Sequence, residues 1–588
     1  MVVYTIDFSS VAKNALNPLS ASVRNYIWQQ LETARSSPQV TSVIITGGLG
    51  NFSAGADISE FDGPALGSSD VNLIELVEAI ENFNKPVVAA VAGNALGGGL
   101  EVALSCHYRI STTTAMLGLP EVMVGVVPGA GGTQRLPRLI GLKTALHHIL
   151  TAQPMTGSRA EQLKLVDATV PVPHQLLLTA QKWAEWAELM PLNDRRVSSK
   201  GVPDAKYAKA IEAHAVKSLP PPSQGGFVQH CALKAVLSSA TSTVSQGKQI
   251  EFDQFKAALT SPQGQARRHA FFAIRKAQKP IASLPQVAAH PLLQPKNSNV
   301  RVAVIGAGTM GGGIALVLLQ AGFSVTVVDI AKAALEKGVK QIHKIVQGNV
   351  AKKKMSPSKA KHILARLSST TRLEDLTNVE LVVEAVVERM KIKKSIFSTL
   401  DKVTPPRCIL LSNTSTLDID EMASVLSPER KKTFAGWHFF SPAHVMKLVE
   451  IVKGKDTSTH IVVLLQALTK RIKKLGVVVG NCYGFCGNRL LRPYGREAAM
   501  ILAEGGARTP QVVDKALNKF GMAMGVFTMG DLAGNDIEYN IRRELGWVRD
   551  PNTGEVGSNR PARYTELGDD LVCKLGRIGQ KVGRVRVF

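Results

Sequence analysis

The stretch VAVIGAGTMGGGIALVLLQAGFSVTVVD, residues 302–329, decides the architecture of the second half of the chain. An apolar run, VAVI, leads into glycines spaced GxGxxG, and a helix-like segment follows before a second apolar run, SVTVV. This order of strand, glycine turn, helix and strand predicts the opening of a Rossmann sheet that binds a dinucleotide. Because half of the 588-residue chain precedes this stretch, we expect other domains before it.

The glycines of this stretch have separate mechanical roles. Gly306 permits the tight turn, Gly308 lets the backbone approach a pyrophosphate, and Gly311 allows close packing of the helix. Asp329 ends the second apolar run, where it can accept hydrogen bonds from a ribose diol and would repel a 2′-phosphate. The pattern therefore predicts NAD as the cofactor, with Met310 also beside it.

Composition limits the possible partners. The chain has 70 Lys and Arg against 46 Asp and Glu, a formal charge of +24, which favours polyanionic ligands such as CoA esters, NAD or nucleic acid. Zinc-finger and RNA-binding signatures are absent from the sequence, so we expect no nucleic-acid partner. The six cysteines are typical of reduced thiols, and we expect neither a metal site nor a membrane span.

Changes in composition divide the chain into four predicted parts. Residues 1–190 alternate short apolar runs with helical patterns, which is typical of an α/β domain. Residues 191–298 read as a linker with a basic helix and several prolines. Residues 299–480 again alternate strands and helices, and residues 481–588 are mainly helical. We therefore predict an α/β multidomain protein.

Polar residues in the second half form a candidate catalytic set. Ser415, His438, Glu450 and Asn488 lie in short segments bounded by Gly and Pro. His438 could serve as a general base because imidazole exchanges protons near neutral pH, and Glu450 could hold its other nitrogen. By residue type alone, a histidine beside two phenylalanines is more often a buried core residue than a catalytic one.

These segments, together with VVEAVVERMKIK (382–393) and the glycine fingerprint, closely resemble the 3-hydroxyacyl-CoA dehydrogenase family. The resemblance implies that His438 is the base and Glu450 its partner. It also implies that Ser415 and Asn488 hydrogen-bond the 3-oxygen of the substrate. Glu388 and Lys393 would lie near the cofactor.

The first half contains two further segments that could carry chemistry, NFSAGADI (51–58) and a glycine-rich stretch over residues 94–136. Glycine turns that lead into helices expose backbone N–H groups, which an oxyanion hole requires. Glu101 follows a GGG turn and Glu121 lies in apolar surroundings, where two carboxyls can have different pKa values. The alternative is that Glu101 caps a helix and Glu121 is a surface charge.

The phrases FSAGADI, ALGGGLE and LPEVMVGVVPGAGGTQRL resemble the crotonase, or enoyl-CoA hydratase, family, whose fold is a ββα spiral. The resemblance implies that the N–H groups of Ala56 and Gly98 form the oxyanion hole. Glu101 and Glu121 would position and activate water. Because both acids are present, hydration is favoured, with Δ3,Δ2-enoyl-CoA isomerisation as a second activity.

The order of the two halves is similar to that of the multifunctional enzymes type 1, the peroxisomal bifunctional enzymes of fatty-acid β-oxidation. The resemblance implies a crotonase domain, a helical linker, a Rossmann domain and an all-α dehydrogenase domain, acting in the peroxisome on enoyl-CoA and 3-hydroxyacyl-CoA. Family members continue with a second helical repeat and commonly end in an SKL-type signal, whereas this sequence ends at GRIGQKVGRVRVF.

This early end leads to an expectation about activity and assembly. We expect residues 481–588 to carry an uncovered apolar face and the dehydrogenase half to be weakened, unless two chains pair through that face. We otherwise expect a monomer. Three alternatives stay open at this point: a shortened isoform with only hydratase and isomerase activity, a crotonase relative that binds RNA, and an inactive scaffold.

Overall fold

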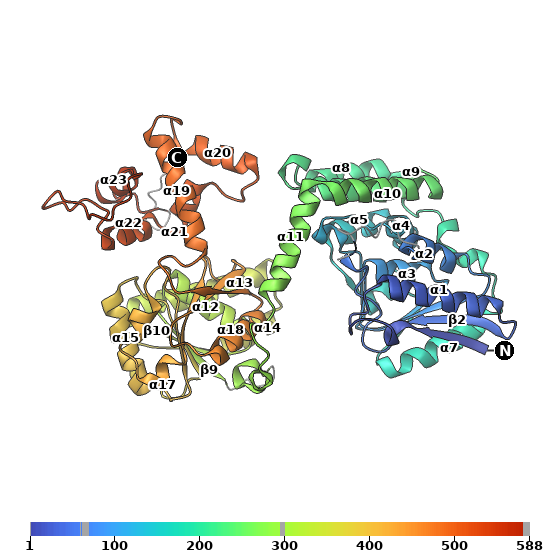
Figure 1. The fold of residues 1–588 in the computed structure, drawn as a ribbon, viewed down its shortest axis with the longest axis horizontal. Helices are drawn as coiled ribbons and strands as arrows, with labels where there is room; N and C mark the ends of the chain where they lie inside the picture. The colour runs from blue at the N-terminus through green and yellow to red at the C-terminus, as the bar shows by residue number, and fades with distance from the viewer. Residues whose placement is uncertain (1, 59, 61–69, 295–299, 580–588) are drawn as a thin grey trace. The chain divides into compact units, whose positions relative to one another are not determined.

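The computed structural model describes residues 2–58, 60, 70–294 and 300–579, which form two compact units, Met1–Phe272 and Ala273–Phe588 (Figure 1). All the candidate site residues named above are among the described residues. Residues 580–588, at the end of the chain, lie outside them.

The first unit is built around a parallel sheet in the order β1-β2-β3-β5-β8. Its strands are β1 (Val2–Asp7), β2 (Val40–Thr46), β3 (Val87–Val91), β5 (Tyr108–Thr112) and β8 (Ala168–Val170). A second, smaller sheet contains β4 (Asn94–Leu96), β6 (Met116–Gly118) and β7 (Met155–Thr156). Every residue of β3 and β5 is buried, as expected for central strands of a parallel sheet covered on both faces.

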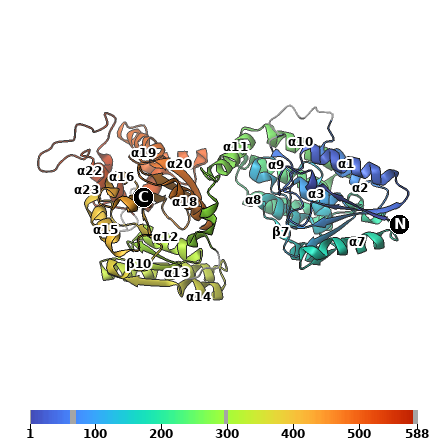
Figure 2. The same ribbon diagram turned by 60° about the horizontal axis from the view of Figure 1, so that its bottom comes forward.

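Helices surround these sheets. They are α1 (Ala21–Ser36), α2 (Leu73–Glu81), α3 (Gly98–Ser105), α4 (Gly132–Ile140), α5 (Leu142–Thr151), α6 (Gly157–Gln162) and α7 (Leu176–Ala187). Three more follow in this unit, α8 (Ala208–Ser218), α9 (Phe227–Thr241) and α10 (Val244–Thr260), and α11 (Pro262–Ala277) begins in the first unit and ends in the second. Helices α9 and α10 lie side by side (Figure 1; Figure 2), and both contact α4.

Part of the predicted linker belongs to the core of the first unit. Val228, Ala232 and Val236 of α9 are fully buried and join the same apolar cluster as the sheet. Ala258 of α10 is also part of it. Apolar residues at helical spacing in residues 227–260 therefore do more than connect two domains, since they complete a core.

The second unit contains an eight-stranded sheet in the order β11-β10-β9-β12-β13-β14-β15-β16. The strands are β9 (Arg301–Ile305), β10 (Ser324–Val328), β11 (Leu367–Thr370), β12 (Leu381–Glu384), β13 (Ile409–Ser412), β14 (Phe434–Phe439), β15 (Leu448–Lys453) and β16 (Leu475–Gly480). Neighbouring strands are parallel except for β14 and β15, which are antiparallel.

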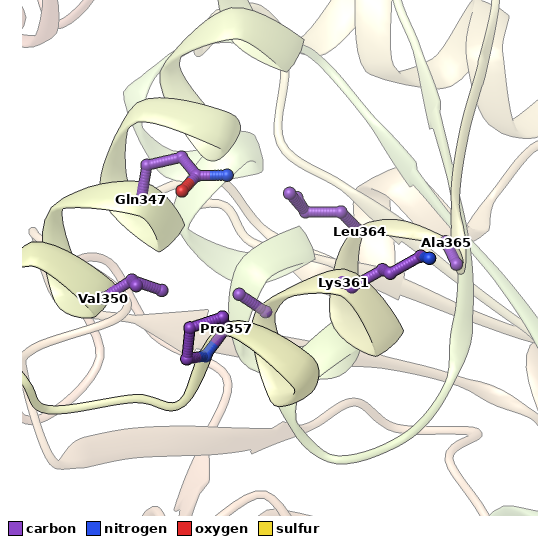
Figure 3. Close-up of a pocket in the computed structure, with 7 residues that line it drawn as sticks. Gln347, Val350, Pro357, Lys361, Leu364 and Ala365 are labelled. Carbon is purple, nitrogen blue, oxygen red and sulfur yellow. The ribbon is translucent and has the colours of Figure 1, made fainter.

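The helices of this sheet are α12 (Thr309–Gln320), α13 (Lys332–Ala351), α14 (Pro357–Leu364), α15 (Met390–Val403), α16 (Ile419–Ala423), α17 (Pro428–Lys431) and α18 (Thr459–Arg471). A cavity of 420 Å³ lies between α13 and α14 (Figure 3) and is lined by Gln347, Val350, Pro357, Ala360, Lys361, Leu364 and Ala365. None of the predicted site residues lines this cavity.

The chain continues into α19 (Gly487–Ala503), α20 (Pro510–Phe520), α21 (Val526–Ala533), α22 (Asn535–Glu544) and α23 (Leu567–Cys573). Their buried core is small, with Ala498, Val513 and Phe527 at its centre. Leu490 and Phe520 of the same helices are 74% and 80% exposed. The described part of these helices thus presents apolar side chains on its surface.

Candidate active sites

Two backbone N–H groups approach each other in the first unit. Helix α3 begins at Gly98, directly after Gly97 in a positive-φ conformation (φ +54°). A Cβ atom placed on Gly98 would lie 3.3 Å from the amide nitrogen of Ala56. A Cβ atom placed on Gly55 would lie 3.4 Å from the amide nitrogen of Gly98. The loop and the helix start are thus close enough for both N–H groups to serve one oxygen atom.

Glu101 lies in the first turn of α3 and is 2% exposed. Its Oε1 accepts hydrogen bonds from the amides of Ala130 (2.8 Å) and Gly132 (2.9 Å), at the start of α4. Burial raises the pKa of Glu101, although these two hydrogen bonds oppose the rise. Glu101 therefore caps the N-terminus of α4 rather than that of its own helix, α3.

Glu121 begins a 3-10 helix, η4 (Glu121–Val124), beside the same glycine turn. A Cβ atom on Gly97 would lie 3.0 Å from Glu121 Oε1, and Oε2 is buried without a hydrogen-bond partner among the described residues. Burial, together with the charge of Glu101, raises the pKa of Glu121 well above its usual range. Glu121 is therefore not the surface charge of the alternative interpretation.

A third buried carboxylate, Glu251 of α10, lies next to this pair. Its Oε1 accepts from the Gly131 amide (2.5 Å), and its Oε2 accepts from the amide (2.8 Å) and the hydroxyl (2.5 Å) of Thr133. Burial, then the charge of Glu101, raises the pKa of Glu251 to about 7. No motif marks this residue, since it stands more than a hundred positions from the turn that it contacts.

The glycine turn of the second unit has the geometry that the fingerprint predicts. Gly306 has φ +100°, and a Cβ atom on Gly311 would lie 1.8 Å from the Gly306 carbonyl oxygen. A Cβ atom on Gly308, at the start of α12, would meet nothing within 4 Å. The first and third glycines are thus required by packing, whereas the space beside the second is open on the side where a pyrophosphate would approach.

Asp329 is tied to this turn by one of its two carboxylate oxygens, and the other accepts from its own loop. Oδ2 accepts from the Ala307 amide (2.9 Å) and Oδ1 from the Ala331 amide (3.0 Å). A carboxylate has about four acceptor positions, so Asp329 can also receive the hydroxyls of a ribose. Met310 is partly buried and packs against the apolar cluster of the second unit. The turn, the helix start and the acid together fit a dinucleotide.

Glu388 holds the loop that carries Ser415 and is itself paired with Lys393. Glu388 Oε1 accepts from the amides of Ser415 (2.8 Å) and Thr416 (3.0 Å), and its Oε2 lies 3.3 Å from Lys393 Nζ. Lys393 also donates to Glu384 (2.6 Å) and is 1% exposed. Burial alone would raise the pKa of Glu388, but the charge of Lys393 and these hydrogen bonds lower it.

His438 and Glu450 face each other across β14 and β15, where they are register partners. His438 Nδ1 lies 2.8 Å from Glu450 Oε2. Glu450 Oε1 accepts from the amides of Cys486 (3.0 Å) and Gly487 (2.8 Å). Burial alone would raise the pKa of Glu450, but the hydrogen bonds from His438 and Gly487 lower it. The carboxylate is thus ionised and accepts a hydrogen bond from Nδ1–H, which leaves Nε2 for a substrate.

The remaining two predicted residues also meet at this site. Asn488, in the first turn of α19, donates from Nδ2 to the Ser415 carbonyl (3.2 Å). The aromatic rings of Phe440 and Phe485 lie 4.7 and 5.8 Å from the imidazole centroid of His438. Residues of three distant segments are therefore brought together beside the imidazole of His438.

The part of the chain that the structure describes contains neither a candidate metal site nor a candidate membrane span. Among these residues, no group of three or more His, Cys, Asp or Glu could hold a metal ion. In the same part of the chain, no helix is both long enough and apolar enough to cross a membrane.

Family models match three segments of the chain. Residues 3–213 match enoyl-CoA hydratase/isomerase, and residues 301–482 match the NAD-binding domain of 3-hydroxyacyl-CoA dehydrogenase. Residues 484–586 match the C-terminal domain of 3-hydroxyacyl-CoA dehydrogenase. These matches confirm the predicted fold class, a crotonase domain followed by a Rossmann domain and a helical dehydrogenase domain, and NAD as the cofactor.

Individual relatives are similar over almost the whole chain. A peroxisomal bifunctional enzyme of Danio rerio is 42% identical over 570 residues, which cover 97% of this chain and 77% of the relative. A peroxisomal bifunctional enzyme of Homo sapiens is 37% identical with the same coverage. Among solved structures, 3-hydroxybutyryl-CoA dehydrogenase from Escherichia coli K12 is 35% identical, covering 49% of this chain and 58% of that one, with a TM-score of 0.43.

Proposed function

The chain belongs to the peroxisomal bifunctional enzyme family of fatty-acid β-oxidation, and we propose that its two units catalyse consecutive steps on one acyl-CoA. The first hydrates a trans-2-enoyl-CoA, and the second oxidises the resulting 3-hydroxyacyl-CoA to a 3-ketoacyl-CoA with NAD. The observation that carries this proposal is that each unit holds its own acid–base pair, Glu101 with Glu121 in the first and His438 with Glu450 in the second.

In the hydratase step, the N–H groups of Ala56 and Gly98 receive the thioester oxygen as negative charge develops on it. Glu101, whose pKa is raised less than that of Glu121, takes a proton from water as the water oxygen bonds to C3. Glu121, whose pKa lies well above the usual range, gives its proton to C2. The two carboxyls then return to their starting states by proton exchange with solvent.

In the dehydrogenase step, Ser415 and Asn488 hold the 3-oxygen of the substrate, and His438 Nε2 takes the hydroxyl proton. Glu450 stabilises the imidazolium that forms, because it is ionised and contacts Nδ1. Bound NAD supplies the acceptor for the hydride that leaves C3. The rings of Phe440 and Phe485 limit the access of water to this position.

The two steps can be tested together. Addition of crotonyl-CoA and NAD to the full chain is expected to produce NADH, because the 3-hydroxy product of the first unit is the substrate of the second. Loss of the enoyl absorbance without NADH would support hydration alone. NADH formed only from added 3-hydroxybutyryl-CoA would support oxidation alone. A chain that does neither would contradict the proposal.

Isomerisation is a second proposed activity of the first unit. The same oxyanion donors would stabilise the enolate of a 3-enoyl-CoA, and the same carboxyls would move a proton between its carbons. This activity is tested by incubating trans-3-hexenoyl-CoA with the full chain and measuring the 2-enoyl isomer by chromatography. A hydration-deficient variant is run beside it as the control. An unchanged substrate would rule it out.

Two finer proposals concern assembly and location. We infer a monomer, with pairing through the exposed apolar residues of α19 and α20 as the competing arrangement, which analytical ultracentrifugation distinguishes. We also infer a peroxisomal location, because relatives bear peroxisomal or glyoxysomal names. Imaging of the full chain with a fluorescent N-terminal fusion tests it. RNA binding and hydratase activity alone are not favoured, because both enzyme families match this chain.

A further inference from the structure

Four successive amides at the start of α4 divide between two carboxylates. The N–H groups of Ala130 and Gly132 donate to Glu101, and those of Gly131 and Thr133 donate to Glu251. The turn is therefore held from two sides, by α3 and by α10. Any displacement of the turn toward or away from Glu251 also moves the two donors that orient Glu101.

Glu251 has little freedom to move. It is 1% exposed, and three donors lie within 2.8 Å of its two oxygens. On the same helix, a Cβ atom at Gly247 would lie 2.1 Å from the side-chain oxygen of Gln134, so α10 contacts α4 closely. Such dense packing fixes side-chain positions to fractions of an ångström.

The charges that face Glu251 come from three elements. Glu101 of α3 and Glu121 of η4 are like charges, and both interact with it electrostatically. Arg135 of α4 is the nearby cation, but it is engaged by Glu81 of α2 (2.7 Å) and by the Ala130 carbonyl (2.9 Å). The negative charge of Glu251 therefore adds to that of Glu101 in favouring the protonated form of Glu121.

We propose that Glu251 is a positioning residue of the hydratase site, which fixes the turn at residues 130–133 and thereby Glu101. This inference rests on the proposed hydratase function of the first unit. Glu251 does not itself reach the substrate in this scheme, since all its described contacts are with the turn.

A second acid provides a matched control. Asp204 accepts from the amides of Leu142 (2.5 Å) and Lys143 (3.0 Å) at the start of α5, as Glu251 does at the start of α4. Asp204 is not among the causes of the raised pKa values of Glu101 or Glu121. Removing its charge therefore reports the general effect of losing a helix cap in this unit.

The test compares Glu251→Gln with Asp204→Asn in crotonyl-CoA hydration by the full chain, with circular dichroism to check folding. An amide has one acceptor oxygen, so the substituted side chain cannot satisfy both Gly131 and Thr133. We expect kcat to fall about 10- to 100-fold, as for a displaced catalytic group, with little change in KM. The alkaline limb of the pH profile is expected to move to lower pH, because Glu121 loses a repelling charge.

Thr133→Val gives a second measurement that does not depend on Glu251→Gln folding. It removes one hydrogen bond to Glu251 but keeps the charge and the shape, so kcat should fall by a smaller factor while the alkaline limb stays in place. Wild-type kcat and pH profile in both variants would overturn the inference, as would equal losses in Asp204→Asn. A wild-type chain that leaves crotonyl-CoA unchanged would instead contradict the proposed function, and the inference with it.

Discussion

Glu121 of the first unit and Glu450 of the second are glutamates beside an active site, and their surroundings shift their pKa values in opposite directions. Burial acts to raise both. Glu450 receives hydrogen bonds from His438, Cys486 and Gly487, which more than offset burial. Glu121 has one unpartnered buried oxygen and a like charge nearby. The donors and the sign of the neighbouring charge together decide whether burial is offset, since Glu251 accepts from three donors beside the like charge of Glu101 and still has a raised pKa.

The largest expected effect is at Glu121. Glu121→Gln removes the proton donor while keeping its shape, so the rate of crotonyl-CoA hydration should fall about 10³- to 10⁴-fold, the upper range for a general acid. Oxidation of 3-hydroxybutyryl-CoA by the same preparation serves as the internal control and should be unchanged. Hydration at the wild-type rate would show that Glu121 is not the acid.

The counterpart in the second unit is Glu450→Gln. Its oxygen can still accept from His438 Nδ1, but it no longer supplies a charge for the imidazolium, so NAD reduction should fall about 100-fold at saturating substrate. Hydration should be unaffected in this variant. An unchanged kcat for oxidation would mean that the pair orients His438 without stabilising its charged form.

Asp329→Ala tests the cofactor side of the second unit. Loss of charge-assisted hydrogen bonds of about 1.5–3 kcal/mol predicts a KM for NAD that rises about 10- to 100-fold, with a smaller change in kcat. Discrimination against NADP should also weaken, because the repulsion of a 2′-phosphate is lost. Equal KM values for NAD in the variant and the wild type would show that Asp329 does not bind the ribose.

The smallest effects concern stability. Ionisation of Glu101 and of Glu450 should change the free energy of unfolding in opposite directions. Glu101 has a raised pKa, so its contribution to stability is greatest below about pH 4.5 and is lost as pH rises through the folded-state pKa. Glu450 has a lowered pKa, so its contribution is present at neutral pH and is lost as pH falls below about 4.5.

Urea unfolding at about pH 7.5 and about pH 4.5 measures this difference. At the higher pH, Glu101→Gln should raise the free energy of unfolding of the first unit, and Glu450→Gln should lower that of the second. A tenfold difference in acid dissociation constant between the folded and unfolded states corresponds to about 1.4 kcal/mol. The increase in the free energy of unfolding of Glu101→Gln is smaller than the pKa shift alone implies, because the amide loses hydrogen bonds that the carboxylate makes. Changes of the same sign in both variants would contradict the electrostatic comparison.

Several features of the candidate sites could be predicted from short stretches of sequence. The turn around Gly306 and Gly311 has the geometry that its spacing demands, because a side chain at Gly311 would collide with the backbone of the turn. The family resemblance named both catalytic sets, and the structure brings the members of each set together. The role of each residue in catalysis is still a prediction, to which the substitutions above are directed.

Other features depended on contacts between distant segments. Glu388 and Lys393 were expected near the cofactor, and the structure adds that Glu388 holds the Ser415 loop through hydrogen bonds while Lys393 pairs with Glu388. Residues 191–298 read as a linker because proline and glycine interrupt them, yet α9 and α10 of this segment complete the first core. Periodicity predicts that a helix has a buried face, but it does not say which surface covers that face.

The sequence by itself determined the order of the two enzyme domains and predicted the NAD turn and the acids, because each of these depends on residues close together in the chain. Only the tertiary structure decided that Glu251 shares a turn with Glu101, and that β14 and β15 pair His438 with Glu450 in register. The physical reason is that a pKa is set by the donors and charges that folding places around a group, and distant segments supply most of them.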